Sequence, residues 1–472
     1  TNTNNQTDQS VTQFRFNVRY EAPVATPLFL KIGGAWLEQG LDSWSKDNHR
    51  WSYIGGGPLA PDPNLLGYSA RETGLRLPRW QSHMFMSERR PRDPSVWRED
   101  LYYHETQKFT ATRSLTESTS AAYAMAQGRL GRDGFLGRTG YLGGVRVEGT
   151  TVDSRGWVRS RALSTAAQQT ADPAGSAARD YANNAREIHG SYTNAFPSLH
   201  AHHDLTSNLK LRASFSTSYG RAALNNFFVN ETPDEANQRL SVNNPALQPQ
   251  TAKNWDTSLE YYFEPVGQLS LGWFHKEIHD YIIDNQEIRI IPSGSDNGYD
   301  GEYSGWTERT SVNGGTAVAQ GWEFSYRQQF TFLPGLLKGL AGSFNYTWID
   351  THGLFDGNVY LTRHEVPGFI PYAANASLSW RYRNFSARIL YNFTGEYITA
   401  YNATSPALHL YRFSMKTVNV GVGYQVSPSL GFSFDVANLF NEPQAFYRGF
   451  KSRSQRTLYN FVTVTAGVNG RF

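Results

Sequence analysis

The residues best suited to chemistry are concentrated in the segment 39–116, which is rich in tryptophan, tyrosine and arginine. Aromatic rings can stack on sugars or on catechol groups, and guanidinium groups can hold carboxylates or phosphates through paired hydrogen bonds. The alternative is that these side chains pack the segment against itself and bind the phosphates of surrounding lipid. We select the following as candidate ligand-binding residues: Trp44, Arg50, Trp51, Tyr53, Trp80 and Trp97.

Two other groups have the residue types of metal sites but not the spacing. His200 and His202 are two residues apart and share one face of a strand, and histidine is a common metal ligand. Only Asp204, in the turn that follows, is placed to complete a site, so we interpret the pair as ordinary histidines facing a wet lumen. Four aspartates between Asp280 and Asp300 lie near glycines but lack the spacing of a calcium loop. We therefore expect no metal site and no cofactor.

The composition excludes several classes of protein. The 472 residues include no cysteine, which excludes a disulfide scaffold, a thiolate metal site and a cysteine nucleophile. The formal net charge of +3 is too small to predict a nucleic-acid partner. The sequence shows no glycine-rich phosphate loop and no catalytic Ser, His and Asp pattern, so we expect that the protein is not an enzyme.

Hydropathy also separates the chain from helical membrane proteins. No run reaches the roughly 18 apolar residues that a membrane helix needs. Aromatic residues nevertheless make up 14% of the chain, although its mean hydropathy is low. This combination is typical of a membrane β-barrel, in which only alternate residues face lipid.

Apolar and polar residues alternate along many segments. Between Val462 and Phe472 the even positions are apolar or small, and the odd positions are polar or glycine, which places one set on each face of a strand. The polar faces also carry charges such as Arg146 and Glu148, which the core of a soluble sandwich would not tolerate. We therefore predict an all-β fold, a transmembrane antiparallel up-and-down β-barrel with a wet lumen. The charged residues that alternation places on the lumen face are Arg212, Glu323, Arg327, Arg381, Arg388 and Glu396.

About fifteen strands can be counted, and the connections between them alternate between short and long. Short connections such as 264–267 and 383–384 predict periplasmic turns, and long ones such as 39–116 and 153–190 predict extracellular loops. The predicted strands are 11–21, 27–38, 117–130, 137–152, 191–203, 207–220, 250–263, 267–290, 303–332, 336–351, 370–382, 385–401, 411–426, 429–439 and 457–472.

The start of the chain does not complete a barrel on this count. Residues 1–10 are polar, and we expect a flexible lead-in there, followed by the barrel over 11–472. Bacterial single-chain barrels have an even number of strands, so fifteen strands leave 11–21 without a partner. Either the count misses one strand or N-terminal strands of the barrel precede this chain, and the unbroken alternation up to the first hairpin favours the second explanation.

Four segments, in this order, resemble elements of TonB-dependent outer-membrane receptors. The run 244–256, leading into 259–263, resembles a segment that precedes a strand about two-thirds along their barrel. The start of the strand at 321–324 and the Asn-Leu-Phe-Asn element within 436–441 are also similar, and 464–472 resembles the closing strand with its terminal phenylalanine. The resemblance covers most of residues 100–472.

Two positions depart from the family's pattern. The family usually has glutamate where this chain has Gln250 and tyrosine where it has Trp255. The resemblance implies a barrel of about twenty-two strands, of which these would be the last fifteen. The plug domain and the N-terminal segment that contacts TonB are not found in this sequence. In the family, the inward-facing charges would face the plug.

The resemblance also implies a function. It implies active import of a scarce ligand across the bacterial outer membrane, driven by the TonB complex through the plug, with a ferric siderophore as the first candidate. Uptake of an oligosaccharide or of cobalamin by the same fold, a passive porin and a structural barrel are the alternatives. The implied partners are outer-membrane lipid and lipopolysaccharide, the TonB complex and a small ligand.

Overall fold

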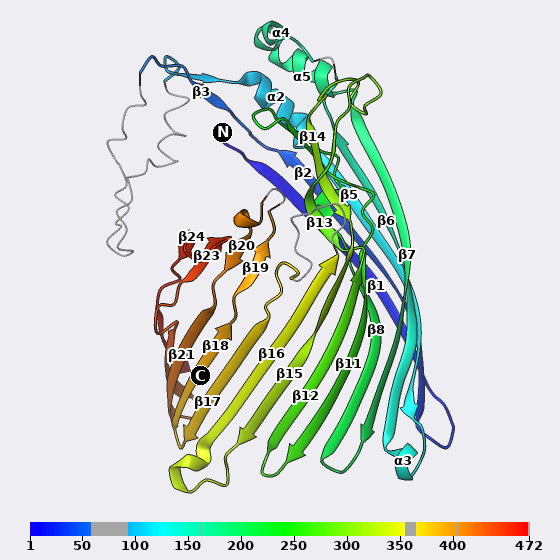
Figure 1. Cartoon of the computed structure of the whole chain (residues 1–472), viewed down its shortest axis with the longest axis vertical. Helices are drawn as coiled ribbons and strands as arrows, with labels where there is room; N and C mark the ends of the chain where they lie inside the picture. The colour runs from blue at the N-terminus through cyan, green and yellow to red at the C-terminus, as the bar shows by residue number, and fades with distance from the viewer. Residues whose placement is uncertain (58–92, 162, 355–364, 403–404, 471–472) are drawn as a thin grey trace.

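One large antiparallel sheet dominates the computed structural model, which describes residues 1–57, 93–161, 163–354, 365–402 and 405–470. The sheet contains 15 strands, and consecutive strands of the sheet are hydrogen-bonded neighbours (Figure 1). In order, the strands are β1 (Asn5–Glu21), β2 (Leu28–Ser45), β5 (Arg113–Arg129), β6 (Thr139–Trp157), β7 (Ala185–Asp204), β8 (Leu209–Gly220), β11 (Gln250–Phe263), β12 (Gly267–His279), β15 (Thr316–Gln329), β16 (Leu340–Leu354), β17 (Tyr372–Tyr382), β18 (Phe385–Thr394), β21 (Met415–Ser427), β22 (Leu430–Ala437) and β25 (Thr463–Gly470).

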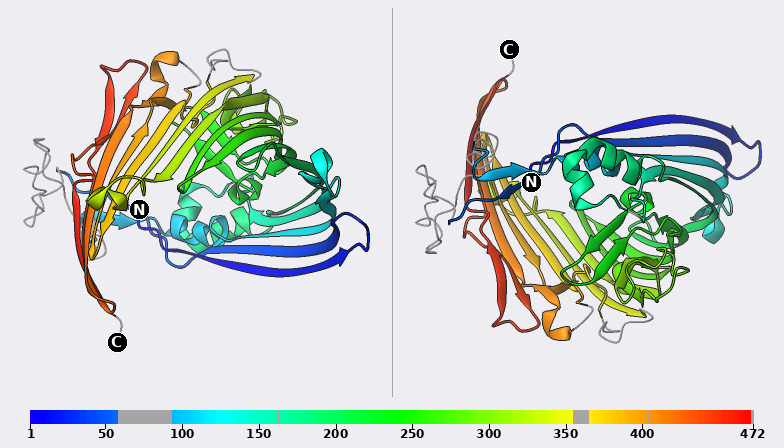
Figure 2. Two further views of the ribbon diagram at one scale, coloured as in Figure 1. Left: turned by 90° about the horizontal axis from the view of Figure 1, so that it is seen from below. Right: turned by 90° about the horizontal axis from the view of Figure 1, so that it is seen from above.

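The sheet curves into an open arc around a central lumen (Figure 2). Among the described residues, β1 and β25 are the two edges of the sheet and do not pair with each other. The predicted up-and-down architecture of about fifteen strands is confirmed. Among the described residues, no helix is both long and apolar enough to cross a membrane.

The register confirms the two faces that alternation predicted. Phe434 lies opposite Val422 and Ala466 on one face, whereas Ser433 lies opposite Gly423 and Gly467 on the other. The apolar face is exposed to its surroundings, with Phe14 at 66% and Val468 at 65% relative exposure. Such a continuous exposed apolar band suits hydrocarbon rather than water. Phe472, which ends the predicted last strand, lies outside the described residues.

The connections are sorted by length to the two ends of the arc, as predicted (Figure 1). The turn end carries the short connections, including the one-turn helices α3 (Gly134–Gly137) and η3 (Gly335–Gly339). The loop end carries the long connections, which form α2 (Leu101–Thr110), α4 (Ala166–Ala171), α5 (Pro173–Tyr181), η2 (Leu224–Phe227), η4 (Pro406–Leu408), and the strands β3 (Trp51–Tyr53), β4 (Trp97–Glu99), β9 (Glu231–Asp234), β10 (Arg239–Val242), β13 (Ile282–Ile290), β14 (Thr307–Asn313), β19 (Tyr397–Ala400), β20 (Leu410–Arg412), β23 (Gln444–Arg448) and β24 (Ser454–Leu458).

Several of the sequence predictions about boundaries are wrong. The predicted strands 385–401, 411–426 and 457–472 are each divided, since β19, β20 and β24 join β23 in a four-stranded sheet outside the barrel wall. The expected lead-in over 1–10 is mostly strand, because β1 begins at Asn5 and pairs with the loop-end part of β2. The predicted strands 267–290 and 303–332 are each divided in two, since β13 and β14 leave the barrel wall. They join β10 and β9 in a separate four-stranded sheet, which satisfies the backbone hydrogen bonds of long loops.

The loop end packs against the inside of the wall. Leu115 and Val152, on the lumen face, form a buried cluster with Phe227, Phe228 and Leu247 from the connection after β8. In both views of Figure 2, the green elements of the loop end lie inside the arc. The long connections therefore fill part of the lumen mouth instead of extending away from it.

Candidate functional site

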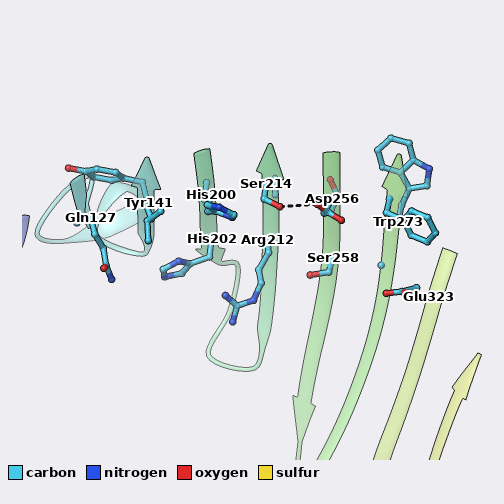
Figure 3. A pocket seen from close by; sticks show the side chains of 17 residues that line it. Gln127, Tyr141, His200, His202, Arg212, Ser214, Asp256, Ser258, Trp273 and Glu323 are labelled. Carbon is cyan, nitrogen blue, oxygen red and sulfur yellow. Dashed lines mark hydrogen bonds between the residues drawn. The ribbon is translucent and has the colours of Figure 1, made fainter. Parts of the chain in front are cut away.

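Polar side chains line the lumen near the turn end (Figure 3). Arg212 faces His202 on one neighbouring strand and Ser258 on the other, and the row continues to Glu323. The Arg212 guanidinium donates a hydrogen bond of 2.8 Å to Glu260, a carboxylate whose second oxygen accepts from a tyrosine hydroxyl. A cavity of about 390 Å³ lies over this row. Both positively and negatively charged side chains line this cavity, so it suits hydrated groups or a polar protein surface.

A denser ionic network lies higher on the lumen wall, below the loop end. Arg221, just after β8, donates to Glu117 on β5 at 2.7 Å and to Glu148 on β6 at 2.6 Å. Arg146 donates to the other oxygen of Glu148 at 2.7 Å. The Glu117 side chain is only 2% exposed, so Arg221 compensates a buried charge. This network fixes the start of the loop after β8 against β5 and β6 of the wall.

A basic cavity of about 490 Å³ adjoins this network on the lumen side of β1 and β2. Its lining includes four basic side chains, Arg15, Lys31, Arg146 and Arg221, against one acidic side chain, Glu148. Arg146 and Arg221 are paired with Glu148 and Glu117, so the excess positive charge comes from Arg15 and Lys31. Such a charge in a partly enclosed space attracts anions and raises their local concentration. This cavity is therefore the strongest candidate on the lumen wall for holding an anionic ligand.

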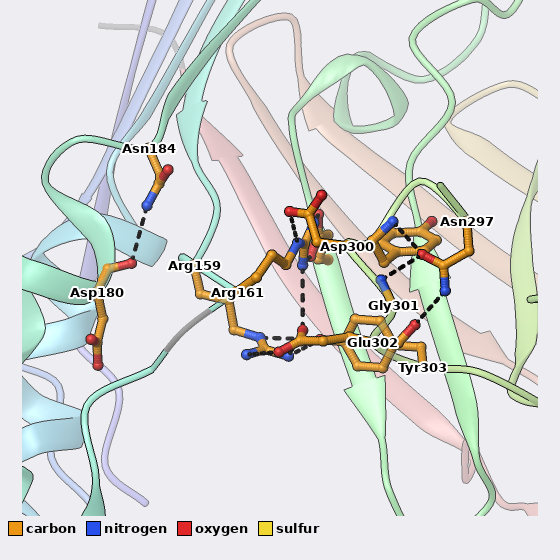
Figure 4. Close-up of polar contacts among 11 residues, drawn as sticks. Arg159, Arg161, Asp180, Asn184, Asn297, Asp300, Gly301, Glu302 and Tyr303 are labelled. Atoms are coloured by element: carbon orange, nitrogen blue, oxygen red, sulfur yellow. Dashed lines mark hydrogen bonds and ion pairs between the residues drawn. The ribbon is translucent and has the colours of Figure 1, made fainter. Parts of the chain in front are cut away.

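Two arginines after β6 hold the four-stranded sheet of the loop end in place (Figure 4). Arg161 donates two hydrogen bonds of 2.7 Å to the carboxylate of Glu231 on β9. Arg159 binds Glu302 at 2.5 Å and the hydroxyl of Tyr303 at 2.6 Å. Both arginine side chains are mostly buried, at 19% and 17% exposure. We call these two arginines with Glu231 and Glu302 the loop clamp.

The loop clamp joins connections that are distant in the sequence. Glu231 is 70 residues from Arg161, and Glu302 is 143 residues from Arg159. Hydrogen bonds to Glu231 raise the pKa of the Arg161 guanidinium, although burial lowers it. Burial raises the pKa of Tyr299, over which Arg161 packs at 5.4 Å, to about 12. The Arg161 guanidinium therefore stays charged across the physiological pH range. Sequence reasoning missed it, because nothing in the local pattern reveals such remote pairs.

Four of the six ligand-binding residues predicted in segment 39–116 make contacts within that segment. Trp51 stacks on a histidine, His49, at 4.9 Å, and Tyr53 meets Trp97 edge to face at 5.3 Å across the β3–β4 pair. Arg50 donates to Asp100 and lies over a tyrosine ring. Trp44 lies on the same outward face of β2 as Trp36, away from the lumen. Trp80 lies outside the described residues.

The lumen residues predicted from alternation fall into separate groups. Arg212 and Glu323 line the turn-end cavity, and Arg381 and Arg388 line another of about 440 Å³, where Arg388 pairs with an aspartate at 2.8 Å. Arg327 lies on the lumen face of β15, opposite Ser343. Glu396 lies beyond the end of β18, where it accepts a hydrogen bond from Tyr447 on β23 and pairs with Lys451 in the turn after β23, so it is not a wall residue.

Within the described parts of the chain, one group has the residue types and proximity of a metal site. Asp47, His49 and His104 place their ligand atoms within 4.8 Å of one another at the loop end. No local pattern in the sequence points to this group, because His104 is remote in the chain from the other two. The predicted group of His200 and His202 lies instead on the lumen wall, where His202 faces Arg212.

Comparison with known proteins identifies the architecture. A family model described as the β-barrel of TonB-dependent receptor-like proteins matches residues 1–439. A search of curated proteins found no match.

Solved structures give the same fold. The chain is similar to the ferric-catecholate import receptor Fiu from K12 E. coli, at 13% identity and a TM-score of 0.63, covering 99% of this chain and 55% of that one. It is similar to the siderophore receptor PiuA from Acinetobacter baumannii at 13% identity and a TM-score of 0.60, covering 98% and 56%. It is also similar to the copper transporter OprC at 12% identity and a TM-score of 0.57, covering 99% and 57%. This chain thus spans only 55% to 57% of the length of these structures.

Proposed function

Because the chain belongs to the family of TonB-dependent receptor β-barrels, we propose that it forms the wall of an importer for a scarce ligand, with a ferric siderophore as the first candidate. Barrels of this family reside in the bacterial outer membrane and transport without catalysing a reaction. The chain is therefore an outer-membrane protein and not an enzyme. The turn end then faces the periplasm and the loop end faces the outside.

The observation that carries the siderophore proposal is the charge of the lumen cavity beside β1 and β2. Ferric complexes with catecholate or carboxylate donors are anionic, and four basic side chains meet there against one acidic side chain. Arg146 and Arg221 are already held by Glu148, so binding an anion beside them costs little further ordering. Lys31 lies at 5.8 Å from the Tyr123 ring, which adds an aromatic surface beside the charge.

The names of similar structures agree with this ligand class. Two of them are described as a ferric-catecholate import receptor and a siderophore receptor, and a third is described as a copper transporter. A neutral oligosaccharide or cobalamin would gain little from the basic cavity and would depend on aromatic surfaces instead. The charge of the ligand is therefore the property that separates these alternatives.

The proposal extends to the partners of the complete protein. We propose that uptake is coupled to the TonB complex, as in the family. The apolar face, with side chains such as Phe14 and Val468, contacts lipid and lipopolysaccharide in this proposal. A passive porin is the contrasting case, and its lumen would conduct ions steadily in a planar bilayer.

Binding by the purified protein, expressed from its complete gene in detergent, tests the ligand class. Tryptophan fluorescence is titrated with a ferric catecholate, a ferric carboxylate complex, cobalamin and a maltooligosaccharide, at low and high salt. We expect an anionic ferric complex to bind, and its affinity to fall as salt screens the cavity. We expect the K31Q variant to bind at least several-fold more weakly. The control K253Q changes a lysine on the outward face of β11 and should bind like the unmodified protein.

Binding of the oligosaccharide or cobalamin, with none of the ferric complexes, would contradict the siderophore assignment. Equal affinity in K31Q and K253Q would show instead that the basic cavity does not hold the ligand.

A further inference from the structure

The extracellular connection after β2 brings two histidines and two carboxylates together. Asp47 and His49 are separated by one residue, and His104 lies in the first turn of α2. Glu99, at the end of β4, completes the group. These residues come from three segments, so a single ion among them would connect β2 to the β3–β4 pair and to α2.

The backbone around the group is held firmly. Asn48, between Asp47 and His49, is 1% exposed. Its side-chain oxygen accepts from the backbone N–H of Asn4 at 2.6 Å, and its amide donates to Asn5 at 2.7 Å. The same amide donates to Gln107 of α2 at 3.1 Å. The loop and the helix are therefore already positioned against each other before any ion binds.

Hydrogen bonds select the ring nitrogen that each histidine presents. Glu99 accepts from Nδ1 of His49, and the carbonyl oxygen of Asn48 accepts from Nδ1 of His104 at 3.0 Å. Carboxylate and carbonyl oxygens can only accept, so Nδ1 carries the proton in both rings. In His104 this leaves Nε2 with its lone pair free, whereas in His49 a proton on Nε2 lies between the ring and Oδ1 of Asp47, where a metal ion would replace it. A ring N–H that donates to a carboxylate or to a backbone carbonyl is the usual support of a metal-bound histidine.

The positions of the ligand atoms suit a small cation. Nε2 of His49 lies 2.5 Å from Oδ1 of Asp47, and the two histidine rings lie 4.8 Å apart at 20°. The ligand atoms of Asp47, His49 and His104 all lie within 4.8 Å of one another. Ligands bound tetrahedrally to Zn²⁺ at about 2.1 Å lie about 3.4 Å apart, so the Asp47 and His49 atoms must separate by about 1 Å and the most distant pair must close by at most about 1.4 Å. The Asp47 side chain is 59% exposed and free to make that movement.

The local charge also favours a cation. Arg50, the nearest arginine in the chain, donates to Asp100 and lies over Tyr103 at 4.5 Å. It therefore neutralises Asp100 instead of Asp47 or Glu99. The carboxylates of Asp47 and Glu99 lie against the two nitrogens of the His49 ring, so the local field favours a cation there.

We propose that Asp47, His49 and His104 form a site for a divalent first-row transition-metal ion such as Zn²⁺, with Glu99 orienting His49. Two imidazole nitrogens and one carboxylate oxygen are the donors that such ions prefer, and water fills the remaining position. Calcium prefers oxygen donors and should not bind. The ion is a resident link within the extracellular loop and not the transported ligand, so this inference is independent of the proposed function.

Zinc titration of the purified protein tests the site. The complete protein in detergent is freed of metal with a chelator, and Zn²⁺ is then titrated in competition with a fluorescent indicator. We expect one tight equivalent per chain, and at least a tenfold loss of affinity in each of D47N, H49A and H104A. Ca²⁺ should not compete. The matched control is H189A, which removes an exposed histidine that pairs with a single aspartate, Asp153, at 2.7 Å.

Two further measurements keep the proposal testable even if a variant assembles poorly. The mobility of unheated samples in SDS gels reports whether each variant has a folded barrel. X-ray absorption at the zinc edge of the unmodified protein should show two imidazole ligands among four nearest neighbours. The proposal is overturned if the unmodified protein binds no Zn²⁺ tightly, if D47N and H104A bind as well as H189A, or if the zinc spectrum lacks imidazole scattering.

Discussion

Removing Arg161 should open the extracellular sheet without disturbing the barrel. In the R161A variant, the Glu231 carboxylate loses two hydrogen bonds of 2.7 Å. Each hydrogen bond to a charged group contributes about 1.5–3 kcal/mol, and loss of one partner of a buried pair costs about 3–5 kcal/mol. Both side chains keep some access to water, at 17% and 15% exposure, so we expect a smaller cost of about 2 kcal/mol. That cost corresponds to an opening constant that is larger by roughly 30-fold.

Hydrogen exchange of the backbone amides measures this opening directly. We expect the amides of β9 and β10 in R161A to exchange roughly 30-fold faster, because these strands are held by the clamp, while those of β16 keep their rates. The matched control is R155A, in which the lost partner is Glu187 at 3.6 Å and both side chains are more than half exposed. Such surface pairs contribute less than about 1 kcal/mol. Equal exchange in R161A and R155A would refute the clamp, and faster exchange throughout the barrel would refute its local character.

Three further outcomes are expected. F434K places a charge on the lipid face and should lower the free energy of unfolding in urea by about 2–4 kcal/mol, whereas S433K, on the lumen face, should stay within about 1 kcal/mol; equal losses would contradict the assignment of faces. R221Q leaves the carboxylate of Glu117 buried without its arginine, which should destabilise the connection after β8 by about 3 kcal/mol. Proteolysis of this connection should therefore become faster, and an unchanged rate of cleavage would contradict the prediction. In metal-free protein, burial lowers the pKa of His49, but Glu99 and Asp47 raise it above the ordinary value of 6.5. Protonation of His49 should therefore stabilise the folded protein fully below pH 6.5. This stabilisation should be lost as the pH rises through the pKa of His49 in the folded protein. Fluorescence of Trp51, read against a W51F variant, should follow this transition, and a flat profile would contradict it.

Much of the barrel wall was predictable from the sequence, because alternation and turn length are local properties. The predicted strand 250–263 coincides with β11, and the fifteen wall strands follow the predicted order. Lumen and lipid faces also follow from alternation, since a shift by one residue would reverse every side chain.

The loop end was not predictable in the same way. The sheet of β9, β10, β13 and β14 contains a parallel pairing of β10 with β14. This pairing brings residues near 240 beside residues near 308. Its partners are chosen by contacts such as Arg161 with Glu231, which no local pattern contains. The residues of the proposed metal site show the same limit, because α2 brings His104 to Asp47 and His49 only after folding. The expectation of a lead-in failed for a related reason: polar residues 5–10 become a strand because β2 extends far enough to pair with them.

Energised uptake tests the central claim most directly. Cells that lack their own siderophore receptors and express the complete gene are supplied with a radiolabelled ferric siderophore that the purified protein binds. Accumulation is compared with and without TonB, and with K31Q and K253Q. We predict uptake that requires TonB, that falls in K31Q and that persists in K253Q. Uptake that proceeds equally without TonB, or a steady open conductance of the purified protein in a planar bilayer, would contradict the account.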